Sequence, residues 1–124
     1  MSSTRGFLKP YPIIVAGQMS GNLTSDVTSI NYLDNVSIEL DFTGNAQGAF
    51  AVEGSLSYFQ DIYGNEVNAG TWTPITLSPA PVAVGVNGSI LLDLNQLSFP
   101  WIRVTYTAVS GTGTCDALIS AKQI

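Results

Sequence analysis

The chain has 124 residues, 45% of them hydrophobic, which is enough for one buried core and too short for two, so we expect a single domain. Charged residues make up only 10%, against about 25% in ordinary soluble domains, and this predicts a neutral, polar surface suited to packing against another protein. The formal net charge is −5 and Lys and Arg total four, so we expect no nucleic-acid partner.

Residues 1–12 contain one glycine and two prolines and lack a strand pattern, so they are predicted to form an extended N-terminal arm. Three apolar side chains in this arm are expected to bind a neighbouring molecule. They are Phe7, Leu8 and Tyr11. The apolar run at 12–16 is too short to cross a membrane or direct export, so we expect no membrane partner and a chain that stays in the cytoplasm where it is made.

Residues 13–124 are predicted to form one β-sandwich domain, because several segments alternate apolar and polar side chains and none shows helical spacing. The clearest case is 35–43, where Val36, Ile38, Leu40 and Phe42 share one face. The predicted strands are 13–17, 27–33, 35–43, 48–57, 73–77, 88–94, 101–109 and 114–123. About eight strands at this regular spacing predict an all-β, jelly-roll-like sandwich.

The same alternation predicts which side chains of the later strands face the core. They are Phe50, Val52, Leu56, Ile90, Leu92, Leu94, Ile102, Val104, Tyr106, Ala108, Cys115, Ala117, Ile119 and Ala121. Gly54 indicates a bulge or a close backbone approach. Pro74 cannot donate a ladder hydrogen bond, so its strand is expected at a sheet edge or a strand start.

Residues 58–71 carry too many turn-forming residues for regular structure, so a long hairpin or loop is expected there. Four aromatic residues in or beside it form a candidate interaction surface, which could stack on a sugar or anchor a protein interface. They are Tyr58, Phe59, Tyr63 and Trp72. The alternative for each tryptophan, Trp72 and Trp101, is packing in the core or at a strand end.

The chain lacks the residue sets of the common catalytic and metal sites. It has no histidine, which excludes a Ser-His-Asp triad and the usual histidine-containing zinc sites, and its single cysteine, Cys115, excludes thiolate clusters. Glu39 and Asp41 are predicted on one strand face rather than across a cleft, and residues 61–66 lack the spacing of a calcium-binding EF-hand. We therefore expect no enzyme, metal or cofactor.

Six segments of the sequence are similar to segments of a known group of proteins. They are VSIELDFTG (36–44), GAFAVEGS (48–55), GTWTPITLSP (70–79), LDLNQLSFPWIRVTYT (92–107), SGTGT (110–114) and ISAK (119–122). Over about residues 30–124 the chain resembles small virion structural proteins of tailed bacteriophages. The resemblance implies a β-sandwich component of the virion, with a capsid decoration or cement protein as the expected role, assembled in the bacterial cytoplasm. It identifies no binding residues.

The expected partners are subunits of the major capsid protein and other copies of the chain, with a homotrimer favoured by closed symmetry on a lattice. Two other roles share these features. One is a carbohydrate- or receptor-binding module of the virion, and the other is a minor tail or head-to-tail joining protein.

Overall fold

The computed structural model describes residues 7–31 and 33–123. Within these ranges the chain forms twelve β-strands. They are β1 (Phe7–Gln18), β2 (Leu23–Thr24), β3 (Thr28–Ser29), β4 (Asn35–Gly44), β5 (Gln47–Ser55), β6 (Phe59–Gln60), β7 (Glu66–Asn68), β8 (Thr73–Pro74), β9 (Val82–Val84), β10 (Gly88–Leu94), β11 (Trp101–Ser110) and β12 (Gly113–Lys122).

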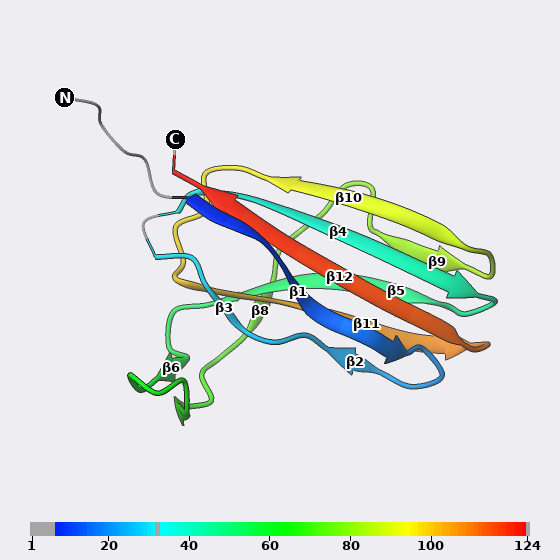
Figure 1. The fold of residues 1–124 in the computed structure, drawn as a ribbon, viewed down its shortest axis with the longest axis horizontal. Coiled ribbons are helices and arrows are strands. Elements are labelled where there is room, and N and C mark those ends of the chain that lie inside the picture. The colour runs from blue at the N-terminus through cyan, green and yellow to red at the C-terminus, as the bar shows by residue number, and fades with distance from the viewer. Residues whose placement is uncertain (1–6, 32, 124) are drawn as a thin grey trace.

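Ten of these strands make two antiparallel sheets (Figure 1). Sheet A has the order β1-β12-β4-β10. In sheet B, β11 and β5 are central, with β2 and β3 beside β11 and with β8 and β9 beside β5. The remaining two strands, β6 and β7, pair only with each other in a short hairpin.

The pairing of the strands is that of a jelly roll. If β2 with β3 and β8 with β9 each count as one interrupted strand, the two sheets contain eight strands. The first pairs with the last, the second with the seventh, the third with the sixth and the fourth with the fifth. This nested antiparallel pattern is two Greek keys wrapped into a double-sheet jelly roll, so the predicted fold class is confirmed.

The inner face of sheet A follows directly from the alternation in β4. Val36, Ile38, Leu40 and Phe42 are all buried, and β4 pairs along its length with β12 on one side and β10 on the other. A one-residue slip would turn these four side chains to solvent, so the buried face determines the register.

The predicted core faces of β10, β11 and β12 are confirmed, with their side chains buried or packed against the buried cluster. The prediction that Leu56 faces inward was wrong. Leu56 is 78% exposed, because β5 ends at Ser55 and the Ser55 hydroxyl accepts a hydrogen bond from the Tyr58 N–H (3.0 Å), which turns the chain away from the sheet.

The predicted boundary between an arm and the sandwich at residue 12 was also wrong. Residues 7–12 belong to β1, in which Leu8 lies opposite Ala121 and Tyr11 opposite Ile119. Register shifts interrupt the pairing near the two prolines, which an edge strand tolerates because one of its sides needs no ladder partner. Residues 1–6 of the predicted arm lie outside the described residues.

Two further expectations concerned single residues of sheet B. Pro74 lies in β8 at the sheet edge, as predicted. Gly54 marks a close approach, because a Cβ at this position would lie 2.7 Å from the ring of Phe99. The β5–β11 register runs without a shift through Gly54, so the alternative of a bulge does not apply.

Candidate functional site

The β6–β7 hairpin has a tip that its own hydrogen bonds hold in place. Asp61 Oδ1 accepts hydrogen bonds from the N–H groups of Tyr63 and Asn65, both at 2.9 Å, and the Asp61 N–H donates to the Asn65 carbonyl at 2.9 Å. The backbone N–H of Asn65, together with that of Tyr63, holds the pKa of the Asp61 carboxyl below its usual value. The tip is therefore a defined turn.

The base of the hairpin is held by an aromatic cluster on the outside of sheet B. The buried Tyr58 ring packs against Trp72 and Trp101, with ring centroids 5.4 and 5.0 Å apart. The Arg103 guanidinium lies 4.2 Å from the centre of the Trp72 ring, and its Nε binds Glu53 Oε1 at 2.7 Å. We call these five residues the aromatic anchor.

Beyond the anchor, the hairpin projects beside the two sheets (Figure 1). It carries large apolar side chains on its surface. Ile62 and Tyr63 at the tip are 91% and 81% exposed. The exposed set, called here the apolar hairpin, is Leu56, Phe59, Ile62, Tyr63 and Val67. Clustered large apolar side chains on a rigid support are typical of protein-interaction sites.

In the structure, the four residues of the predicted aromatic surface do not lie on one surface. Phe59 and Tyr63 are exposed on the hairpin, whereas Tyr58 is buried and Trp72 is half-buried in the anchor. The four rings therefore do not form one exposed platform for a sugar. Sequence reasoning missed Ile62 and Val67, for which an apolar residue next to turn-forming residues was the available signal.

The three residues predicted to bind a partner through an arm also differ in their exposure. Leu8 packs against the core, and the half-buried Tyr11 donates its hydroxyl hydrogen bond to Thr28 Oγ1 at 2.8 Å. Phe7, with 63% of its surface exposed, is the one of the three that remains available for contact.

A groove of about 430 Å³ runs along the base of the hairpin between the end of β5, β8 and the segment before β11. Its lining contains no charged side chain and includes the apolar surfaces of Pro74, Ile75 and Phe99. The lining residues are Gly54, Ser55, Leu56, Ser57, Thr71, Thr73, Pro74, Ile75, Ser98 and Phe99.

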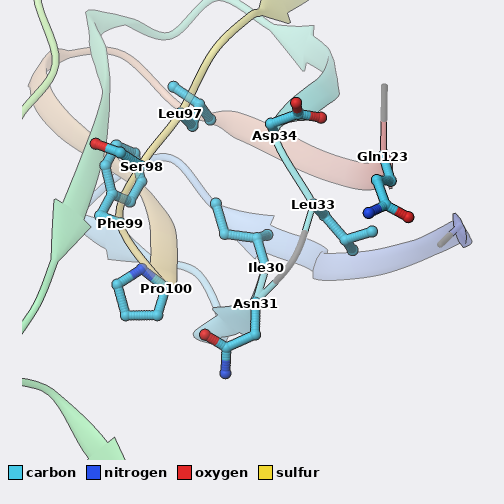
Figure 2. Close-up of a pocket in the computed structure, with 9 residues that line it drawn as sticks. All are labelled: Ile30, Asn31, Leu33, Asp34, Leu97, Ser98, Phe99, Pro100 and Gln123. Carbon is cyan, nitrogen blue, oxygen red and sulfur yellow. The ribbon is translucent and has the colours of Figure 1, made fainter.

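A second hollow, of about 460 Å³, lies at one end of the sandwich where two loops and the end of the described chain meet (Figure 2). The loops are tied together by hydrogen bonds from the Ile30 N–H to the Pro100 carbonyl (2.8 Å) and from the Leu97 N–H to the Asp34 carbonyl (3.0 Å). Asp34 is the one acidic residue among the described lining residues, so they do not supply the carboxylate pair of a glycosidase. The lining residues are Ile30, Asn31, Leu33, Asp34, Leu97, Ser98, Phe99, Pro100 and Gln123.

The outer faces of the two sheets differ in charge. Sheet A exposes four carboxylates, Glu39, Asp41, Asp93 and Asp116, and the Asp41 carboxylate raises the pKa of its neighbour Glu39. Beyond the Arg103–Glu53 ion pair, the strands of sheet B carry no charged side chain, and most of their exposed side chains are small or β-branched. This uncharged face is formed by Thr24, Ala49, Ala51, Val82, Val84, Thr105 and Thr107.

Among the described residues, no group of three or more Cys, Asp or Glu side chains is placed to hold a metal ion. No helix within the same ranges is long and apolar enough to cross a membrane. Comparison with protein-family models gave no match, and comparison with curated proteins gave no similar sequence.

Proposed function

We propose that the chain is a non-enzymatic virion structural protein, a decoration protein that binds the head of a tailed bacteriophage and stabilises its lattice of major capsid protein. The observation that carries this proposal is the jelly-roll pairing of the strands, an architecture used by viral capsid domains, on a chain that also has an uncharged outer sheet face. Since one fold serves many functions, the role must also be supported by the chemistry of the surface.

The uncharged face is the surface proposed to contact the capsid. Burying a carboxylate without a partner is costly, and sheet A would bury four of them in such a contact, whereas the uncharged face would bury none. Its side chains are short, so a partner surface can approach the sheet closely over several residues. Each copy then needs only a modest affinity, because the lattice presents many equivalent sites.

The test uses heads purified from the phage that encodes the chain. Ala49 and Thr107 are cross-strand neighbours on the uncharged face, and the double variant Ala49→Arg/Thr107→Arg places two desolvation-sensitive charges there. It should lose co-sedimentation with the heads. The matched control, Ser37→Arg/Ser120→Arg, changes two cross-strand neighbours on the outside of sheet A and should co-sediment as the wild type does.

Copy number separates decoration from the other virion roles. A decoration protein should be present in a number comparable with that of the capsid lattice sites, measured by quantitative mass spectrometry of purified particles. A few copies per particle would instead indicate a tail or joining protein, and absence from the particles would overturn the virion assignment. Equal binding by the two double variants would reject the uncharged face as the contact.

A further inference from the structure

The free edge of β10, at one side of sheet A, is the one long and regular sheet edge among the described residues (Figure 1). β10 has seven residues, and its pairing with β4 runs without a register shift. Register shifts interrupt β1 at the opposite edge of sheet A, and both edges of sheet B are divided into strands of two or three residues. Short or irregular edges block pairing with other chains, whereas a long regular edge permits it.

We propose that the free edge of β10 binds an extended peptide segment of another protein, in which apolar side chains alternate with Lys or Arg, as an additional antiparallel strand of sheet A. The orientation follows the other pairs of this sheet, which are all antiparallel. The added strand lies beside β10 in the plane of the sheet and leaves the outer faces uncovered, so the proposal is independent of the capsid contact.

The backbone of this edge leaves alternate residues without a ladder partner. The Asn45 N–H donates to the Thr112 carbonyl at 2.9 Å, which extends the β4–β12 register by one step, so the odd-numbered residues of β4 bond to β12. The even-numbered residues of β4 then bond to β10, since an antiparallel strand alternates its hydrogen bonds between its two neighbours. The odd-numbered residues of β10 lie opposite odd-numbered residues of β4, so their N–H and C=O groups point to the free edge. They are Ser89, Leu91 and Asp93.

The inner side of this edge is open and apolar. Ile90 and Leu92 pack against the core but are only partly buried, because among the described residues no strand lies beyond β10. A hollow of about 380 Å³ lies beside them, between β10 and residues 77–82, and Asp93 is the one charged residue in its lining. An added strand would place the side chains opposite Ile90 and Leu92 over this hollow, so these side chains should be apolar.

The outer side of the same edge is acidic. Asp93 lies on the edge itself, and Glu39 and Asp41 lie on the outer face of the neighbouring strand β4. No Lys or Arg of the described residues forms an ion pair with any of these three carboxylates. Lys or Arg at the outward positions of an added strand would supply the missing positive charge, and the aliphatic part of such a side chain would pack on Leu91, which is 71% exposed.

The same carboxylates disfavour a second copy as the occupant. β10 contains no Lys or Arg, so pairing of two β10 strands would bring the acidic edges of two chains together without a cation between them. Each chain also has a net charge of −5, which adds to the repulsion. The edge therefore rejects itself and admits a cationic strand, which is selection through a repulsive element.

The probe is a synthetic peptide of the same length as β10, capped at both ends, in which Lys and Val alternate and a fluorophore is attached to one end. Its affinity for the full chain is measured by fluorescence anisotropy. The wild type should bind this peptide, and should bind a peptide with Glu in place of each Lys roughly tenfold more weakly or less, because like charges then meet at the edge.

Backbone methylation separates strand addition from simple attraction between charges. When its Val side chains face the hollow, the antiparallel peptide directs the N–H groups of its Lys residues towards β10 and those of its Val residues away from it. Methylation of the central Lys amides should abolish binding to the wild type. Methylation of the same number of Val amides leaves the charge and the bonded N–H groups unchanged, and this peptide should still bind.

Two substitutions test the edge of the protein itself. Leu91→Pro removes an N–H that β4 does not use and should abolish peptide binding, whereas Leu91→Thr keeps this donor and should retain binding. Asp93→Lys should weaken binding roughly tenfold. Its control, Asp26→Lys, makes the same change of net charge between β2 and β3 and should bind as the wild type does. Thermal unfolding checks that every variant is folded.

The proposal is overturned if the wild type does not bind the Lys–Val peptide at millimolar concentration. Equal affinity for the two methylated peptides would also overturn it, because charge attraction without strand addition would then account for the binding. Light scattering tests the remaining occupant. A wild type with the mass of two chains that Leu91→Pro reduces to the mass of one would assign the edge to a second copy instead.

Discussion

Cys115 lies near the start of β12 with none of its surface exposed, and burial raises the pKa of its thiol to about 11. In the unfolded chain the pKa of a cysteine is about 8.5. The folded state therefore holds the thiol proton more tightly than the unfolded state does. The thiolate is the reactive form of cysteine, so this residue is structural at neutral pH.

We predict that the stability of the chain falls as the pH rises from about 8.5 towards 11, because unfolding then releases the Cys115 proton. Below about pH 8.5 this contribution is fully present. Urea unfolding at a series of pH values measures the slope, and Cys115→Ala should make it shallower. An unchanged slope in the variant would assign the pH dependence to other groups, such as Tyr106, whose pKa burial also raises.

The Tyr106 hydroxyl is buried in the core and has no hydrogen-bond partner among the described residues. An unsatisfied buried hydroxyl costs roughly 1 to 3 kcal/mol, so Tyr106→Phe should leave the free energy of unfolding unchanged or raise it. The control is Tyr58→Phe, since the Tyr58 hydroxyl accepts a hydrogen bond from Gln60 Nε2 at 2.8 Å and its loss should cost about 1 kcal/mol. Chemical denaturation of both variants tests the pair, and a clear loss in Tyr106→Phe would contradict the prediction.

At the scale of elements, β1 is the strand that the structure redefines. Its first half covers the end of β12, with Leu8 packed against the core and Tyr11 hydrogen-bonded to Thr28. Proline and bulges keep this edge irregular, which protects an exposed edge strand from pairing with other chains.

Deleting residues 2–11 should therefore destabilise the domain rather than remove a separate arm. Loss of the partly buried Leu8 and Tyr11 should lower the free energy of unfolding by roughly 2 kcal/mol, measured by urea denaturation. The shorter deletion of residues 2–5 leaves β1 whole and is the control. If the longer deletion were as stable as the wild type, the pairing of β1 with β12 would contribute nothing to stability.

The hairpin is the other element that has its own role. Its two strands are too short to be stable by themselves, so the aromatic anchor decides its position. Arg103 stabilises this anchor through two contacts, one with the Trp72 ring and one with Glu53. These contacts explain why one of the few cations of the chain lies there.

At the scale of the whole molecule, the outer faces of the two sheets differ in the role proposed for them. The uncharged face of sheet B is the proposed capsid contact, and the acidic outer face of sheet A is left to solvent. This arrangement keeps the four carboxylates of sheet A away from the proposed capsid contact.

The sequence by itself determined the fold class and the inward faces of β4, β10, β11 and β12. In these strands the side-chain alternation is a local property with a period of two, and a buried face admits only one register. The absence of histidine likewise restricted the possible chemistry, because it is a property of composition and does not depend on the fold. The hairpin was predicted from its turn-forming residues, and two of its exposed aromatic residues, Phe59 and Tyr63, were identified.

Only the tertiary structure decided the features that depend on contacts between distant segments. Residues 7–12 form a strand because β12, more than a hundred positions later, offers an edge to pair with. Tyr58 is buried because Trp101 comes to lie beside it, and the groove exists because Phe99 packs on Gly54. Local patterns carry no information about such pairs, since their energy arises only when the two sheets close around one core.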